Sequence, residues 1–204
     1  MNKQVIVDFI GSIEYTPEQI NESLTKNNGK LIVSGIMQRG STDEQRAFNQ
    51  NGRSYPLPIL RREADKYKRS FIAERRALGE LDHPESQVVN LSNVSHNVLD
   101  LWWSGNDLMG KIEILPTPSG NIAKELLKAG IRLGISSRGM GSVKNLGEGK
   151  VEVQDDFEIV CWDLVSNPST QGAFMNNLNE SKSVVKVDKY SKINSLIGDI
   201  ISLM

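Results

Sequence analysis

Along this 204-residue chain, short apolar segments with β-branched residues follow one another more often than they alternate with helical segments. Because consecutive parallel strands need a crossover, usually a helix, this order disfavours an open parallel sheet. The pattern predicts an α+β protein built as a mixed, mostly antiparallel β-barrel, closed or nearly closed, with a few helices packed around it. The segments predicted to be strands are 3–10, 30–37, 87–92, 94–103, 107–115, 131–137 and 151–164.

Two stretches show helical spacing instead. A helix that starts near Pro58 is predicted to end before Gly79, and a second helix is predicted over 121–129. Ser119 is a candidate N-cap for the second helix, and Gly130 follows at the position of a C-terminal cap. The apolar residues that recur at helical spacing in the first stretch are Leu60, Ala64, Tyr67, Phe71 and Leu78.

The composition indicates a soluble globular protein and excludes several kinds of partner. Hydrophobic residues make up 38% and charged residues 24% of the chain, and the net charge is −1. This balance favours neither nucleic acid nor a membrane surface, and no apolar run approaches the roughly 18 residues that a spanning helix needs. The one cysteine, Cys161, excludes an intramolecular disulfide and fits a reducing cytoplasm.

The C-terminal end differs from the rest of the chain. Residues 175–183 are polar, and residues 184–204 are moderately amphipathic. We therefore expect one folded domain over 1–175 and a flexible C-terminal tail over 176–204.

A histidine-dependent enzyme has only two candidate bases here, because the chain has two histidines. His83 lies directly after the first predicted helix, among carboxylates that can raise its basicity. His96 lies inside a predicted strand. Each, taken alone, is more often a structural or surface histidine.

Ser136 is the candidate nucleophile, in the stretch LGISSRGMG over 133–141. A serine hydroxyl needs a base to take its proton and donors to hold the oxyanion. The alternative nucleophile, Cys161, sits among apolar residues, where an inert buried thiol is expected. The histidines and the cysteine show no metal-ligand spacing, so neither a metal nor another cofactor is predicted.

Five short blocks, taken together, resemble the prohead core proteases of large tailed phages, in the order found in that family. The resemblance covers about residues 30–175 and implies a fold like that of the herpesvirus assemblin serine proteases, a mixed β-barrel surrounded by helices. The blocks are 51–56 (NGRSYP), 77–84 (ALGELDHP), 102–107 (WWSGND), 134–141 (GISSRGMG) and 163–169 (DLVSNPS).

The resemblance also implies roles for individual residues. His83 becomes the general base and Ser136 the nucleophile. Asp163 is assigned to orient His83, although assemblins use a second histidine there, and Asp82, Asp156 and Glu158 are its rivals. His96 is expected to be structural. The expected oxyanion and substrate-binding groups are the backbone near Ser137, Arg138 and Gly139, helped by the Arg138 side chain.

Family members are similar to enzymes that cut after glutamate in a Leu/Ile-x-Glu context. A glutamate side chain needs a cationic partner, and Arg53 is the candidate, with Arg138 as the alternative. Leu178-Asn179-Glu180 fits this pattern, so self-cleavage after Glu180 is expected to release 181–204. Leu78-Gly79-Glu80 also fits but is expected to be folded away.

The resemblance implies substrates and a place of action. The expected substrates are the scaffold or core proteins of the prohead and the major capsid protein, inside the assembling prohead in the host cytoplasm. A homo-oligomer, dimeric or higher, is left open. Two alternatives also stay open: an inactive scaffold or core component, and a serine hydrolase of small esters.

Overall fold

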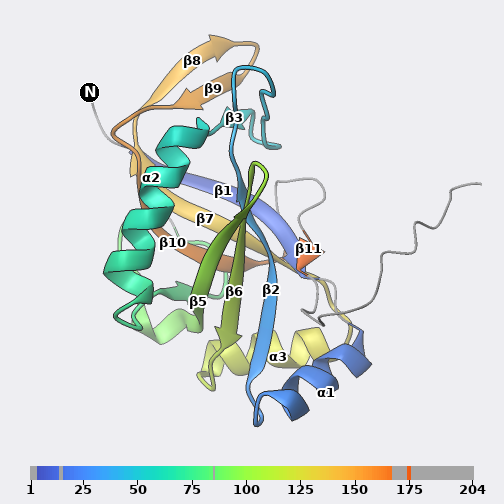
Figure 1. Ribbon diagram of the computed structural model, residues 1–204. Coiled ribbons are helices and arrows are strands. Elements are labelled where there is room, and N and C mark those ends of the chain that lie inside the picture. The colour runs from blue at the N-terminus through green and yellow to red at the C-terminus, as the bar shows by residue number, and fades with distance from the viewer. Residues whose placement is uncertain (1–3, 14–15, 85, 167–173, 176–204) are drawn as a thin grey trace, which may run out of the picture.

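Two four-stranded sheets form the body of the protein (Figure 1). The computed structural model describes residues 4–13, 16–84, 86–166 and 174–175. The first sheet has the order β10-β7-β1-β11, with β1 Gln4–Ile13, β7 Leu133–Gly141, β10 Glu158–Val165 and β11 Phe174–Met175. The second has the order β2-β6-β5-β4, with β2 Leu31–Arg39, β4 Leu78–Glu80, β5 Val94–Ser104 and β6 Asp107–Ile114.

A smaller third sheet packs beside these two. Its order is β3-β9-β8, with β3 Arg53–Ser54, β8 Val143–Gly147 and β9 Lys150–Val153. The β1–β11 and β3–β9 pairs are parallel, and the other strand pairs are antiparallel. The α+β class and the mostly antiparallel pairing are therefore confirmed.

The predicted closed barrel is not found among the described strands. Between the first two sheets, β10 and the end of β4 share one isolated parallel bridge, Leu81–Leu164. The ladder cannot continue there because β4 is three residues long and Asp82, at φ +68°, turns the chain away. The two sheets thus meet at a seam without forming a continuous hydrogen-bonded ring.

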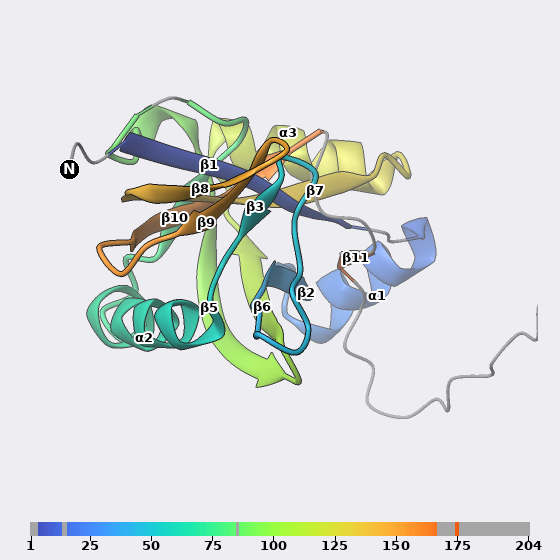
Figure 2. The same ribbon diagram turned by 90° about the horizontal axis from the view of Figure 1, so that it is seen from above.

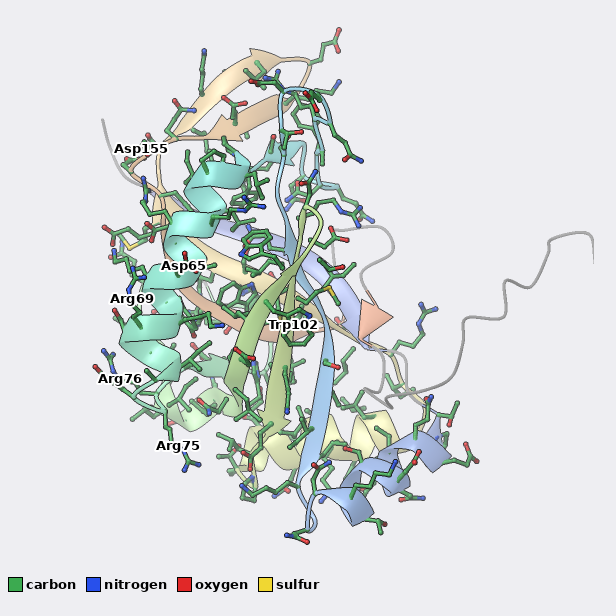
Figure 3. The ribbon with its side chains drawn as sticks, in the orientation of Figure 1. Asp65, Arg69, Arg75, Arg76, Trp102 and Asp155 are labelled. Carbon is green, nitrogen blue, oxygen red and sulfur yellow. The ribbon has the colours of Figure 1, made fainter. Side chains whose placement is uncertain are left out.

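Helix α2 (Leu57–Tyr67) covers the first sheet from one side, as Figure 2 shows. Its predicted apolar face is confirmed, since Leu60, Ala64 and Tyr67 are buried. The Tyr67 ring meets Trp162 of β10 edge-on, with 4.9 Å between the ring centroids. On the outer side, Figure 3 shows charged residues such as Asp65 and Arg69.

The first predicted helix ends earlier than its spacing suggested. It continues after α2 only as a short π-helix, η1 (Lys68–Ile72), and Leu78–Glu80 forms β4 instead. The placement of His83 directly after a helix was therefore wrong, since this histidine follows a strand. The Gly79–His96 pairing with β5 explains why the segment is extended.

Three other differences concern element ends and short elements. Helix α3 (Pro118–Lys128) is capped by Thr117, not Ser119. Helix α1 (Pro17–Lys26) was not predicted, although Thr16 and Gln19 form a capping box at its start. The expected strand 87–92 is absent, and the 3-10 helix η2 (Leu91–Asn93) lies at its end.

The predicted strand 151–164 is two strands, β9 and β10, with a turn between them. Helices α1 and α3 lie together at one end of the sheets (Figure 1). Within the described ranges, no helix is both long and apolar enough to cross a membrane.

Candidate active site

Strands β7 and β10 present four chemically active side chains on one face. Ser136 stands opposite Asp163, and Arg138 stands opposite Cys161, in antiparallel register. Alternate residues of a strand point to the same face of the sheet. The pairing therefore places a hydroxyl, a carboxylate, a guanidinium and a thiol side by side.

The bridge at the seam brings His83 to this face. Leu81 pairs with Leu164, and the Asp82 N–H donates to the Leu164 carbonyl at 2.7 Å. The Asp82 carboxylate then accepts the His83 backbone N–H at 2.9 Å. The chain that leaves β4 consequently carries the imidazole past the edge of β10. In Figure 2, this green segment after β4 lies on the side of the first sheet opposite to α2.

The imidazole connects Asp163 with Ser136. His83 Nδ1 lies 2.7 Å from Asp163 Oδ2, and His83 Nε2 lies 3.2 Å from Ser136 Oγ. An ionised carboxylate only accepts hydrogen bonds, so the Nδ1 proton is donated to Asp163 and Nε2 is left to accept from the hydroxyl. This is the arrangement of nucleophile, base and orienting group that acyl transfer requires.

Asp163 is held in its ionised form although it is completely buried. Burial alone would raise its pKa, but the hydrogen bonds from His83 and the Glu80 backbone N–H and the charge of Arg138 lower it below the ordinary value. The Glu80 N–H donates to Oδ1 at 2.9 Å. A buried anion with these partners keeps its charge at neutral pH.

The rival carboxylates have other partners. The Asp82 side chain accepts the backbone N–H of His83, not its ring. Asp156 accepts hydrogen bonds from Ser142, and Glu158 lies 3.8 Å from Lys66. The geometry thus brings Asp163, the residue favoured by the sequence, to the imidazole.

The side chain of Arg138 is not placed to bind a substrate anion, and that expectation was wrong. The guanidinium is fully buried and lies 2.6 Å from Glu80 Oε1 and 3.0 Å from Asp163 Oδ2. Burial disfavours its charge, yet Cys161, Glu80 and Asp163 raise the pKa of Arg138 above its ordinary value. Its charge is already matched by two carboxylates.

The backbone N–H groups of Ser137, Arg138 and Gly139, which are the expected oxyanion donors, belong to a central strand. Strand β7 pairs with β1 on one side and with β10 on the other. In a central strand, backbone N–H groups are taken up by the two ladders. The assignment of these N–H groups as oxyanion donors therefore stays a prediction.

Ser137 and Gly139 belong to the opposite face of β7. Both alternate with Ser136 and Arg138 along the strand, and Ser137 is paired with the buried Trp162. A Cβ on Gly139 would lie 2.4 Å from the Phe157 ring. This glycine thus makes room for a core aromatic ring, not for a substrate.

Arg53 is not part of the cluster. It lies in β3, in the third sheet, and its backbone N–H donates to Asn49 at 2.9 Å. That sheet contributes none of the three groups joined through His83. Glu180 and the tail 176–204 lie outside the described residues.

The other histidine and the cysteine occupy structural positions. His96 is fully buried in β5, with Nδ1 2.9 Å from the Ser95 hydroxyl. Burial lowers the pKa of His96 to about 4, which keeps the ring neutral. Burial and the charge of Asp163 raise the pKa of the Cys161 thiol, which argues against a cysteine nucleophile.

The cluster is closed to solvent in this structure. Ser136 and Asp163 are fully buried, and the His83 side chain is 4% exposed. A peptide can therefore reach the hydroxyl only after neighbouring groups shift. Among the described residues, no group of three His, Cys, Asp or Glu side chains is placed to hold a metal ion.

Sequence reasoning did not find Glu80 as part of the site. Its side chain is completely buried, and it pairs with Arg138, which lies 58 positions away in the chain. The local signal was a carboxylate three positions before His83, inside the block 77–84 (ALGELDHP). That spacing points to the site only when the Leu81–Leu164 bridge is known, and no local sequence pattern predicts this bridge.

Comparisons with known proteins show the family of this chain. A family model described as "Prohead core protein serine protease" matches residues 7–183. The prohead core protein protease of Enterobacteria phage T4 is 32% identical over 149 residues, which cover 71% of this chain and 68% of that protein. The solved structure of the bacteriophage T4 capsid assembly protease has a TM-score of 0.65 at 26% identity, covering 81% of this chain and 99% of that one. The chain therefore belongs to the prohead core protein serine protease family.

Proposed function

We propose that this protein is a serine endopeptidase with Ser136 as nucleophile, His83 as general base and Asp163 as the orienting carboxylate. One observation carries the proposal. The imidazole lies 2.7 Å from the carboxylate and 3.2 Å from the hydroxyl, through its two different nitrogens. Family membership supports proteolysis as the reaction.

The proposed reaction is acyl transfer in two halves. His83 Nε2 takes the Ser136 proton as Oγ attacks the scissile carbonyl, and the protonated ring then gives that proton to the leaving amine. Water attacks the acyl-enzyme in the second half and releases the new carboxyl terminus. Asp163 keeps the Nδ1 proton in place and stabilises the imidazolium in both halves.

The proposed substrates are scaffold or core proteins and the major capsid protein. Cleavage takes place inside the assembling prohead in the host cytoplasm, after glutamate in Leu/Ile-x-Glu sequences. The family supports the class of substrate, and Leu178-Asn179-Glu180 in the chain itself fits the preference. Self-cleavage after Glu180 then divides the chain into a protease domain and the released segment 181–204. The enzyme acts without a cofactor.

Intact-mass measurement of wild type beside Ser136→Ala tests the proposal. We expect wild type to lose its C-terminal segment and to cut a glutamate-containing peptide, and the variant to do neither, with its rate lowered by several orders of magnitude. Undiminished cleavage by Ser136→Ala would refute the assignment of the nucleophile. Ser142→Ala is a matched control, because Ser142 binds Asp156 and lies outside the cluster.

The complete burial of Ser136 favours one second candidate, an inactive core component. In that case, Ser136, His83 and Asp163 are present but do not catalyse a reaction. This hypothesis predicts no peptide cleavage by wild type and normal capsid maturation with Ser136→Ala.

A further inference from the structure

A buried ion pair lies directly behind the His83–Asp163 couple. Arg138 Nη2 is 2.6 Å from Glu80 Oε1, and both side chains are completely buried. Burying two charges costs free energy unless further hydrogen bonds satisfy them. The further hydrogen bonds of Arg138 and Glu80 therefore indicate the function of this ion pair.

Arg138 fixes the carboxylate of Asp163. Its Nε lies 3.0 Å from Oδ2, and its Nη2 lies 3.2 Å from Oδ1. His83 Nδ1 reaches the same Oδ2, and the Glu80 backbone N–H reaches Oδ1. Because both carboxylate oxygens are held by donors, Asp163 is fixed in the orientation that meets the imidazole.

The same ion pair also holds the segment that carries His83. Arg138 Nη1 donates to the Ser86 carbonyl at 3.0 Å, and Glu80 Oε1 accepts the Asn90 N–H at 3.0 Å. These contacts lie three and seven positions after His83. One guanidinium and its counter-ion thus anchor both the base and the carboxylate behind it.

The charges of this cluster do not cancel. Arg138 contributes one positive charge, and Glu80 and Asp163 contribute one negative charge each, which leaves one net negative charge beside the ring. A negative charge in a buried site stabilises the imidazolium that forms during proton transfer. Three further ionisable groups interact with Asp163, and all three are neutral: burial raises the pKa of the Cys161 thiol and of Tyr67 and lowers the pKa of His96. The Asp82 carboxylate accepts the backbone N–H of His83.

We propose that the Glu80–Arg138 pair is a positioning device for this protease. Arg138 orients Asp163 and anchors the His83 segment, and Glu80 holds Arg138 and adds a second negative charge to the cluster behind the imidazole. The proposal rests on the catalytic roles given above. It assigns Arg138 to the support of the base instead of to substrate binding.

A histidine titration followed by NMR tests the charge of Glu80 without any need for activity. In a Ser136→Ala background, the two ring signals of His83 and His96 are easily distinguished, because His96 is buried and stays neutral to about pH 4. Glu80→Gln keeps the shape and removes one negative charge. We expect the titration midpoint of His83 to fall by about one pH unit.

The matched control is Glu125→Gln, which removes an exposed carboxylate paired with Lys128. It should leave the midpoint of His83 unchanged. A Glu80→Gln midpoint equal to that of the parent would overturn the proposed electrostatic role of Glu80. This readout is independent of whether Ser136 is the nucleophile.

Kinetics with a glutamate-containing peptide test positioning. For Glu80→Gln, the acid limb of the kcat/KM profile should move to lower pH by the same amount, whereas a merely structural role lowers activity at every pH without moving the limb. Arg138→Lys keeps the positive charge but loses the planar set of N–H donors of the guanidinium. It should lower kcat by about 10- to 100-fold with KM nearly unchanged and the acid limb in place.

An Arg138→Lys enzyme with wild-type kcat would overturn the anchoring role. If Glu80→Gln fails to fold, Glu80→Asp keeps the charge on a shorter side chain, and the proposal then expects a wild-type acid limb with a lowered kcat. A shifted acid limb in Glu80→Asp would refute it. Loss of the proposed function itself would appear separately, as activity retained in Ser136→Ala.

Discussion

At the scale of single residues, residues 136–139 of β7 alternate between two faces of the sheet, as successive residues of a strand do. Ser136 and Arg138 face the cluster, and Ser137 and Gly139 face the core. Their chemistry made Ser136 and His83 candidates, and the family resemblance implied their roles. From the sequence, the Arg138 side chain was expected to contact the substrate, because an arginine beside glycines is often exposed. Its buried carboxylate partners become visible only in the folded structure.

Replacing Asp163 with asparagine tests how much the orientation of the His83 imidazole contributes to catalysis. The amide cannot both accept from Nδ1 and match the charge of Arg138, so we expect kcat to fall by about 10³- to 10⁴-fold. Peptide cleavage at saturating substrate measures this loss, with circular dichroism to check folding. Asp156→Asn is the control, because Asp156 binds Ser142 instead. Equal losses in the two variants would contradict the assignment.

The buried His96 should make stability depend on pH. Its folded pKa of about 4 lies below the ordinary 6.5, so the unfolded chain binds a proton that the folded protein does not. Stability is therefore full above pH 6.5 and falls by up to about 3 kcal/mol as pH drops to 4. Asp163, whose folded pKa is lowered, adds a loss only below its ordinary value of 3.8.

Urea unfolding of the Ser136→Ala protein at pH 7 and pH 5 measures this effect. His96→Gln in the same background should lose less unfolding free energy between pH 7 and pH 5 than the Ser136→Ala parent does. This difference between the two pH values does not depend on how stable the variant is at pH 7. The same pH slope in parent and variant would show that another group is responsible.

At the scale of elements, periodicity predicted long strands and one helix face well, and it failed where tertiary pairing decides. Helix α2 has the predicted buried stripe, because the burial of one face sets that spacing. The segment from Leu78 onward continued the helical pattern by spacing alone, but its pairing with β5 made it a strand. The start of α3 was misplaced because both Thr117 and Ser119 are good caps.

The cap of α3 can be tested directly. The Thr117 hydroxyl accepts the Gly120 N–H at 3.0 Å and donates to the Val94 carbonyl. Thr117→Ala should lower the free energy of unfolding by about 1 kcal/mol or somewhat more, and Ser119→Ala by less than about 0.5 kcal/mol. Urea denaturation of both variants gives the comparison. The reverse order would place the cap where the sequence had suggested.

At the scale of the whole molecule, the candidate active site forms where two sheets meet. Ser136 and Asp163 belong to the first sheet, and His83 belongs to the chain that leaves the second sheet through the Leu81–Leu164 bridge. The site is therefore complete only when the two sheets are docked. No local pattern in the sequence predicts this, because the seam joins residues about 80 positions apart.

The fold should also decide which of two matching sequences is cut. Leu78-Gly79-Glu80 and Leu178-Asn179-Glu180 both fit the proposed preference. The first is in β4, where Gly79 and Glu80 are buried and paired with β5, so its backbone cannot enter another active site while the protein is folded. The second lies in the polar stretch after the last strand.

We therefore expect wild type to mature to a product that ends at Glu180 and Glu180→Gln to keep its full length, because the amide removes the charge on which the proposed preference for glutamate depends. Intact-mass measurement over time distinguishes the two. Glu148→Gln, at an exposed turn between β8 and β9, is the control and should mature normally. Maturation of Glu180→Gln to the same length would show that the tail is cut elsewhere. A fragment that begins at Leu81 would show that β4 opens more readily than its pairing allows.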